Sequence, residues 1–169
     1  MTQILLFAAA LFIPGTPRVD NFIVQAELQG LYDEISQATL QFATASDIDE
    51  FHEVLYTPDW VFTDPDGHAR TWPEMRQDAV RALSAPRLDS MTQPIRTLSV
   101  DPGGATVVVN VITVHTIVDH EGRYGRPDAS HTLTQTTAFR DRWVRVSDEW
   151  KLKSRQQIGR PGESVDKPE

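Results

Sequence analysis

The chain has 169 residues, no cysteine and a formal net charge of −8. This length suits a single domain with its own core, and 40% hydrophobic with 24% charged residues is ordinary for a globular protein. The absence of cysteine excludes disulfides, zinc–thiolate centres and thiol nucleophiles. The acidic balance argues against a general nucleic-acid-binding surface.

Charge is unevenly distributed along the chain. Eleven acidic residues and one basic residue, Arg18, precede residue 67, whereas seven of the sixteen basic residues lie between Arg140 and Arg160. The two halves can therefore attract each other, within one molecule or between subunits. The basic segment can equally be a solvated face of a sheet.

A run of ten apolar residues, 4–13, lies near the start and is followed by proline and glycine. The run is too short to span a bilayer as a helix, but it has the length of a signal-peptide core. No basic residue precedes it, and no clear cleavage site follows it. Residues 1–18 are interpreted as the signal peptide of a secreted or periplasmic protein, or as an N-terminal extension packed on the domain of a cytoplasmic one.

The first half of the sequence predicts three helices. Apolar residues recur at helical spacing over residues 19–45. Ser46 is expected to cap a second, shorter helix, because carboxylates occupy the turn that follows it. Thr71, with Glu74 three residues later, predicts the cap of a third helix.

Strands dominate the rest of the sequence. Alternation of apolar and polar residues predicts a strand over 59–64, a turn at "DPDG" and a short return strand over 68–71. The second half is rich in Val, Ile, Thr and aromatic residues, which favours four strands, over 95–100, 106–118, 130–146 and 149–157. Residues 160–169 are predicted to be a disordered tail. The order predicts one α+β domain over 19–159, with helices on one face of a curved antiparallel sheet.

Three stretches carry a family resemblance: "LYTPDWVFTDPDG", "TWPEM", and the pair "FRDRWVRV" and "EWKLKSRQ". With the element order, they resemble the nuclear transport factor 2-like superfamily, most closely its SnoaL-like and ketosteroid-isomerase-like branches, over residues 25–158. The resemblance implies a cone-shaped cystatin-like roll, in which the sheet wraps round three N-terminal helices and leaves a cavity open at one end. Members include isomerases, dehydratases, epoxide hydrolases and cyclases, and others only bind small molecules or form dimers.

Asp64 is the candidate general base. Trp60, Phe62 and Asp64 alternate on one face, so the carboxylate lies at the cavity wall if that face looks into the cone, and burial would then raise its pKa. The resemblance matches Asp64 to the base of steroid isomerases. Their enolate-stabilising tyrosine has no counterpart around residues 39–42, and Tyr32 is two helical turns too early. Asp64 is therefore a base or a residue that only shapes its turn.

Two histidines are candidate proton partners for that base. His115 and His131 each alternate with apolar neighbours on a predicted strand, so each either lines the cavity or is a satisfied core histidine. Which sheet face lines the cavity is left open. Further side chains that either contact a ligand or simply pack are the following: Tyr56, Trp60, Phe62, Trp72, Gln135 and Trp143.

No metal or cofactor is predicted. Asp64, Asp66 and His68 cluster at one turn, but their order does not fit a calcium loop. The sequence has no nucleophile elbow, phosphate-binding loop or dinucleotide fingerprint. No motif therefore points to a redox cofactor.

The preferred interpretation is a small-molecule-binding cone domain that forms a homodimer through the outer sheet face. Its ligand is expected to be a small apolar or carbonyl-containing molecule, with neither nucleic acid nor a membrane span involved. One alternative is a cofactor-free isomerase, lyase or polyketide-cyclase-type enzyme with Asp64 as base. Another is a non-catalytic dimerisation module, so the sequence leaves open whether the protein is an enzyme.

Overall fold

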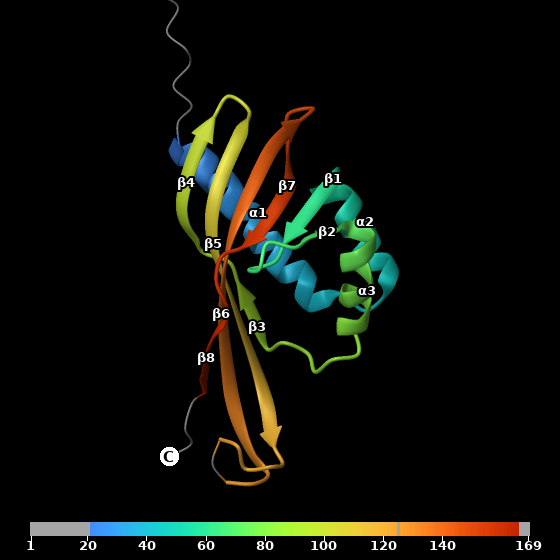
Figure 1. Cartoon of the computed structure of the whole chain (residues 1–169), viewed down its shortest axis with the longest axis vertical. Coiled ribbons are helices and arrows are strands. Elements are labelled where there is room, and N and C mark those ends of the chain that lie inside the picture. The colour runs from blue at the N-terminus through green and yellow to red at the C-terminus, as the bar shows by residue number, and fades with distance from the viewer. Residues whose placement is uncertain (1–20, 125, 166–169) are drawn as a thin grey trace, which may run out of the picture.

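The computed structural model describes residues 21–124 and 126–165 (Figure 1). The predicted signal peptide, residues 1–18, lies outside the described residues and stays a prediction. Within the described part, no helix has the length and apolar character needed to cross a membrane. The described elements are three helices and eight strands: α1 Asn21–Gln41, α2 Ala45–Leu55, α3 Trp72–Ala82, β1 Tyr56–Thr63, β2 Ala69–Thr71, β3 Ser90–Thr92, β4 Ile95–Asp101, β5 Gly104–Asp119, β6 Ala129–Val146, β7 Glu149–Gln157 and β8 Gly162–Val165.

Helix α1 packs one stripe of side chains against the sheet. Val24, Leu28, Tyr32 and Ile35 recur every three or four residues, and all are buried. The helix crosses the upper part of the sheet, whereas α2 and α3 lie beside β1 (Figure 1). The three helices therefore cover only one end of the sheet.

The cap of α2 differs from the prediction. Thr44, not Ser46, is the N-cap: its hydroxyl accepts a hydrogen bond from the Asp47 N–H at 3.2 Å, and the Asp47 carboxylate accepts one from the Thr44 N–H at 2.9 Å. Ser46 lies inside the helix, where its hydroxyl donates to Glu50. Asp47 determines where α2 begins, because its side chain and backbone can form the reciprocal hydrogen bonds of a capping box only with the residue three positions earlier, Thr44.

The strands form one curved sheet in the order β2-β1-β7-β6-β5-β3, with β4 also paired to β5 and β8 to β6. This confirms the α+β architecture with a curved, mainly antiparallel sheet. One pairing departs from the antiparallel prediction, because β1 pairs with β7 in parallel. The predicted disordered tail is also wrong over Gly162–Val165, which pairs with β6. Backbone pairing with a strand edge orders these residues in spite of their polar composition.

The register of β5 and β6 decides which sheet face is inner. Their pairing runs without a bulge from Ala105 opposite Trp143 to Asp119 opposite Ala129, so the odd-numbered residues of both strands share one face. Ala105, Val107 and Trp143 on this face are fully buried near the helices. Toward the other end the hairpin projects beyond the helices (Figure 1).

Gly104, at the start of β5, offers a test of this packing. Its φ is +142°, and a Cβ atom there would lie 2.0 Å from the carbonyl oxygen of Trp143. We expect Gly104→Ala to lower the free energy of unfolding by at least about 2 kcal/mol, because the strand must shift to relieve the clash. Urea unfolding followed by circular dichroism measures the change.

Gly30→Ala is the matched control. Gly30 lies within α1, and a Cβ atom there would meet no atom within 4 Å. This variant should be more stable than the wild type by about 0.5–1 kcal/mol, because alanine loses less backbone entropy in a helix. Equal effects of the two substitutions would contradict the close approach of Gly104 to β6.

Candidate functional site

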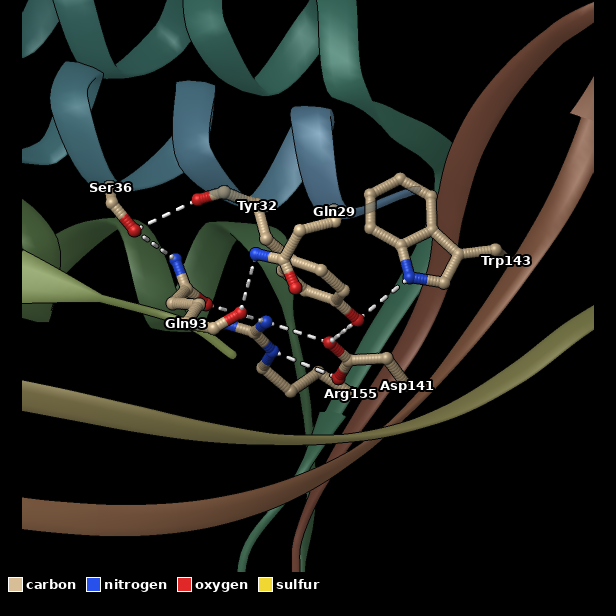
Figure 2. Close-up of polar contacts among 7 residues, drawn as sticks. All are labelled: Gln29, Tyr32, Ser36, Gln93, Asp141, Trp143 and Arg155. Carbon is tan, nitrogen blue, oxygen red and sulfur yellow. Dashed lines mark hydrogen bonds and ion pairs between the residues drawn. The ribbon is translucent and has the colours of Figure 1, made fainter. Parts of the chain in front are cut away.

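Four side chains from α1, β6 and β7 form a buried polar network (Figure 2). Arg155 binds Asp141 in a bidentate pair, with Nε 2.9 Å from Oδ1 and Nη2 2.7 Å from Oδ2. The Tyr32 hydroxyl donates to Oδ2 of Asp141 at 2.7 Å and accepts from the indole N–H of Trp143 at 2.9 Å. Asp141, Tyr32 and Trp143 are fully buried. The carboxylate thus accepts three hydrogen bonds, and both of its oxygens are engaged.

Burial fixes the protonation states of this network. Burial raises the pKa of Tyr32 and the Asp141 charge raises it further, so the phenol keeps its proton and remains a donor. For Arg155, burial by itself would lower the pKa, but the Asp141 carboxylate outweighs that effect and raises it. The Arg155 guanidinium therefore keeps its proton next to the Asp141 carboxyl group.

Gln93 extends the network to the connection between β3 and β4. Its side-chain oxygen accepts from Nη2 of Arg155 at 3.2 Å, and its amide donates to the Ser36 hydroxyl at 3.3 Å. The Gln29 amide donates to the Gln93 carbonyl oxygen at 3.2 Å (Figure 2). Gln93 is fully buried, so each of these contacts replaces a lost contact with water.

Two donors at the edge of the network keep hydrogen-bonding capacity. Among the described residues, neither Nη1 of Arg155 nor the Tyr56 hydroxyl has a hydrogen-bond partner. Burial raises the pKa of Tyr56, and the charges of Arg155 and Asp141 also act on it, so its hydroxyl lies within their electrostatic reach. On the side of α1 the polar groups of the network are hydrogen-bonded to one another. The donors without a partner in the described part of the chain, Nη1 of Arg155 and the Tyr56 hydroxyl, belong to β7 and β1.

An aromatic cluster surrounds His52 next to Tyr56. The His52 ring stacks on Trp72 at 3.9 Å and on Tyr56 at 4.8 Å, and Trp60 meets it edge-on at 6.1 Å. His52 and Trp60 are buried, and neither Nε2 of His52 nor Nε1 of Trp60 has a partner in the described part of the chain. Burial lowers the pKa of His52, which favours the neutral ring.

Asp64 lies just outside β1 and caps its own turn. Its Oδ1 accepts from the backbone N–H groups of Asp66 and His68, both at 2.9 Å, and Oδ2 lies 3.2 Å from Nδ1 of His68. These contacts, led by the His68 N–H, lower the pKa of Asp64, so the expectation of a raised pKa is wrong. Within the described ranges, no three Asp, Glu or His side chains are grouped to hold a metal ion.

The structure does not bring His115 and His131 to Asp64. Both histidines lie on the inner face of the projecting β5–β6 hairpin, as does Gln135. The end of β1 is level with Arg140 of β6. His115 instead pairs with Leu133, seven residues earlier in β6, which is roughly 23 Å away along the strand. His131 is 2% exposed, and neither ring nitrogen has a partner in the described ranges.

The sequence analysis missed most of the polar network. Asp141 and Trp143 are two residues apart on β6, so alternation could have placed them on one face, and Tyr32 follows Leu28 by four residues on the buried stripe of α1. His52 lies on the buried stripe of α2 in the same way. Gln93 carries no comparable signal, because it lies between two strands.

A model of the SnoaL-like domain family matches residues 31–156. The chain belongs to the SnoaL-like family. This confirms the resemblance to the nuclear transport factor 2-like superfamily, to which the α+β cone fold also conforms. No curated protein matches this SnoaL-like sequence.

Solved structures support the same fold. A conserved protein from Planctomyces limnophilus is 14% identical (TM-score 0.60; 83% of this chain and 98% of that one covered). A Mycobacterium tuberculosis protein of unknown function is 18% identical (0.58; 87% and 76%). A candidate scytalone dehydratase from Novosphingobium aromaticivorans is 14% identical (0.54; 88% and 90%). Identities this low indicate a shared fold and leave the activity of this SnoaL-like chain open.

The lowered pKa of Asp64 predicts how Asp64→Asn behaves with pH. A carboxylate whose pKa is lower in the folded state stabilises that state above its unfolded pKa of 3.8, and this contribution disappears as the pH falls through the folded value. We expect Asp64→Asn to be less stable than the wild type at neutral pH and equally stable at strongly acidic pH. Thermal unfolding across the pH range measures this, and a pH-independent difference would contradict the turn-capping role.

Proposed function

We propose that this SnoaL-like protein binds a small, mostly apolar molecule with a carbonyl oxygen inside its cone, at Tyr56 and Arg155. The observation that carries this proposal is the pair of unpartnered donors at the edge of an otherwise saturated buried network. Both donors belong to partly buried residues, and a ligand oxygen within reach of the two would accept a hydrogen bond from each. The family's ligand-binding and isomerase-type members are consistent with a site in the cone.

The surroundings favour a neutral ligand with an apolar body. Asp141 already neutralises Arg155, so a second carboxylate would gain little, whereas a carbonyl oxygen can accept from Nη1 of Arg155. Phe139 lies 4.9 Å from the Arg155 guanidinium and 6.5 Å from the Phe62 ring. These rings offer an apolar wall beside the donors.

Binding is favoured over the predicted proton-transfer chemistry because neither Asp64 nor the two predicted histidines is available near these donors. Asp64 accepts hydrogen bonds from its own turn, and both oxygens of Asp141 already accept hydrogen bonds from Arg155 and Tyr32. His115 and His131 lie far along the hairpin. The isomerase, lyase or cyclase alternative requires a base within hydrogen-bonding distance of the substrate, and none of the predicted residues supplies one.

Tyr56→Phe tests the proposed site, because it removes one hydroxyl and keeps the ring that stacks on His52. Native mass spectrometry of the freshly purified protein would identify a co-purified ligand, and aromatic ketones such as 1-tetralone serve as calorimetric probes. We expect the ketone affinity to fall about fivefold to tenfold, the effect of one hydrogen bond, with little change in stability.

Tyr124→Phe is the matched control, because Tyr124 lies in the loop at the far end of the β5–β6 hairpin, beside His131. This variant should bind the ketones like the wild type. An equal loss in both variants, or no loss in Tyr56→Phe, would contradict a ligand oxygen at Tyr56.

A homodimer through the outer sheet face is also proposed. The even-numbered residues of β5 and β6 form this face, and Ile112, Val114 and Thr136 on it are only half-buried in the single chain. Ile112→Arg should therefore shift a dimer toward monomer, because a charge would have to be buried in the interface. Sedimentation velocity measures this, and a wild-type protein that sediments as a monomer would contradict the proposal.

A further inference from the structure

A concavity lies away from the polar network, between α1, α2 and the start of β7. Its volume is about 410 Å³, and none of the residues predicted to bind a ligand lines it. Leu31, Ile35, Phe51 and Leu55 provide apolar lining, and the indole of Trp150 also lines it. This volume and lining suit a small organic molecule rather than a folded segment of another protein.

Acidic side chains dominate the polar part of this groove. Glu27, Glu34 and Glu149 line it, against a single cation, Lys151. Glu27 accepts from Arg145 at 2.6 Å and from the Trp150 indole N–H at 2.8 Å. Lys151 lies 3.1 Å from Glu149 and also donates to the carbonyl oxygen of Val54. Its charge is therefore already neutralised.

Glu34 is left with its charge uncompensated. In the described part of the chain it has no hydrogen bond or ion pair, and it is exposed at the groove. The two helices that flank the groove also contribute, because residues 21–55 contain seven acidic residues and no lysine or arginine, and within the described ranges arginines from other elements pair with only two of them, Glu27 and Asp49. The potential at the groove is therefore negative, and it favours a cationic occupant.

The groove also offers an aromatic surface that already attracts a cation. The Arg145 guanidinium carbon lies 4.5 Å from the centroid of the Trp150 ring. Indole is the best of the side-chain rings for this contact, and Phe51 provides a second ring at the same groove. An ammonium group next to an aromatic or branched apolar body matches all of these features.

We propose that this groove binds a small hydrophobic amine, with its apolar body on Leu31, Phe51 and Trp150 and its ammonium group paired with Glu34. The site is separate from the proposed carbonyl site in the cone and shares no residue with it. It therefore gives the protein a second ligand class, selected by charge rather than by buried hydrogen bonds.

Three naphthalene probes of similar shape test the charge selectivity by isothermal titration calorimetry: 1-naphthylmethylamine, 1-naphthalenemethanol and 1-naphthaleneacetate. The amine should bind about tenfold more tightly than the carboxylate, with the alcohol between them, and added salt should reduce the difference because the groove is open to solvent. Equal affinities for the three probes, or no binding of the amine, would overturn the proposal.

Glu34 variants locate the amine. We expect Glu34→Gln to weaken amine binding about threefold and Glu34→Lys about tenfold, while binding of the alcohol stays unchanged. Glu53→Lys is the control, because it makes the same charge change on the exposed surface of α2 outside the groove. A loss of amine binding in Glu53→Lys as large as in Glu34→Lys would overturn the assignment to the groove.

Tyr56→Phe separates this proposal from the one for the cone. Amine binding should be unchanged in Tyr56→Phe, whatever that variant does to ketone binding. A parallel loss of amine and ketone affinity in Tyr56→Phe would overturn the groove as the amine site.

Discussion

The ion pair between Asp141 and Arg155 is the constraint on which the rest of the structure depends. A fully buried carboxylate is tolerated only when its lone pairs are satisfied and a cation is adjacent. Here two bonds from Arg155 and one from Tyr32 meet that requirement. Because the three residues lie on β6, β7 and α1, the pair joins the helix layer to the centre of the sheet.

This constraint places the other parts of the molecule. Tyr32 holds α1 against β6, and the indole of Trp143 closes the network above it. Gln93, the farthest member, ties the short β3 to the same helix. The helices are thus confined to one end of the sheet, and the long hairpin projects from the other (Figure 1). The two donors left unpartnered among the described residues, Nη1 of Arg155 and the Tyr56 hydroxyl, belong to the edge of this network.

Charge is arranged by the same topology. Arg145 pairs with Glu27 and Lys153 with Asp59, so the basic second half does compensate the acidic first half within one chain. The compensation is incomplete around α1 and α2, where Glu34 keeps its charge beside an apolar groove. The ion pair of Asp141 and Arg155 is therefore internally neutral, whereas the groove beside Glu34 keeps a negative charge next to aromatic side chains.

Local patterns in the sequence determined the three helices, the principal strands and the α+β class. Helical spacing and strand alternation act over a few residues, so they are readable without tertiary contacts. The cap at Thr71 was predicted for the same reason, since Glu74 completes it locally. The cone-shaped fold was predicted from the family resemblance, which short motifs carry.

Only the tertiary structure decided which residues meet. The parallel pairing of β1 with β7, the inner face of the hairpin and the strand formed by Gly162–Val165 all depend on contacts between distant segments. Asp64 looked like a base from its alternation with Trp60 and Phe62, yet its own turn supplies its donors. Tyr32 and Asp141 are 109 residues apart in sequence. No local pattern indicates that the Tyr32 hydroxyl donates a hydrogen bond to the Asp141 carboxylate.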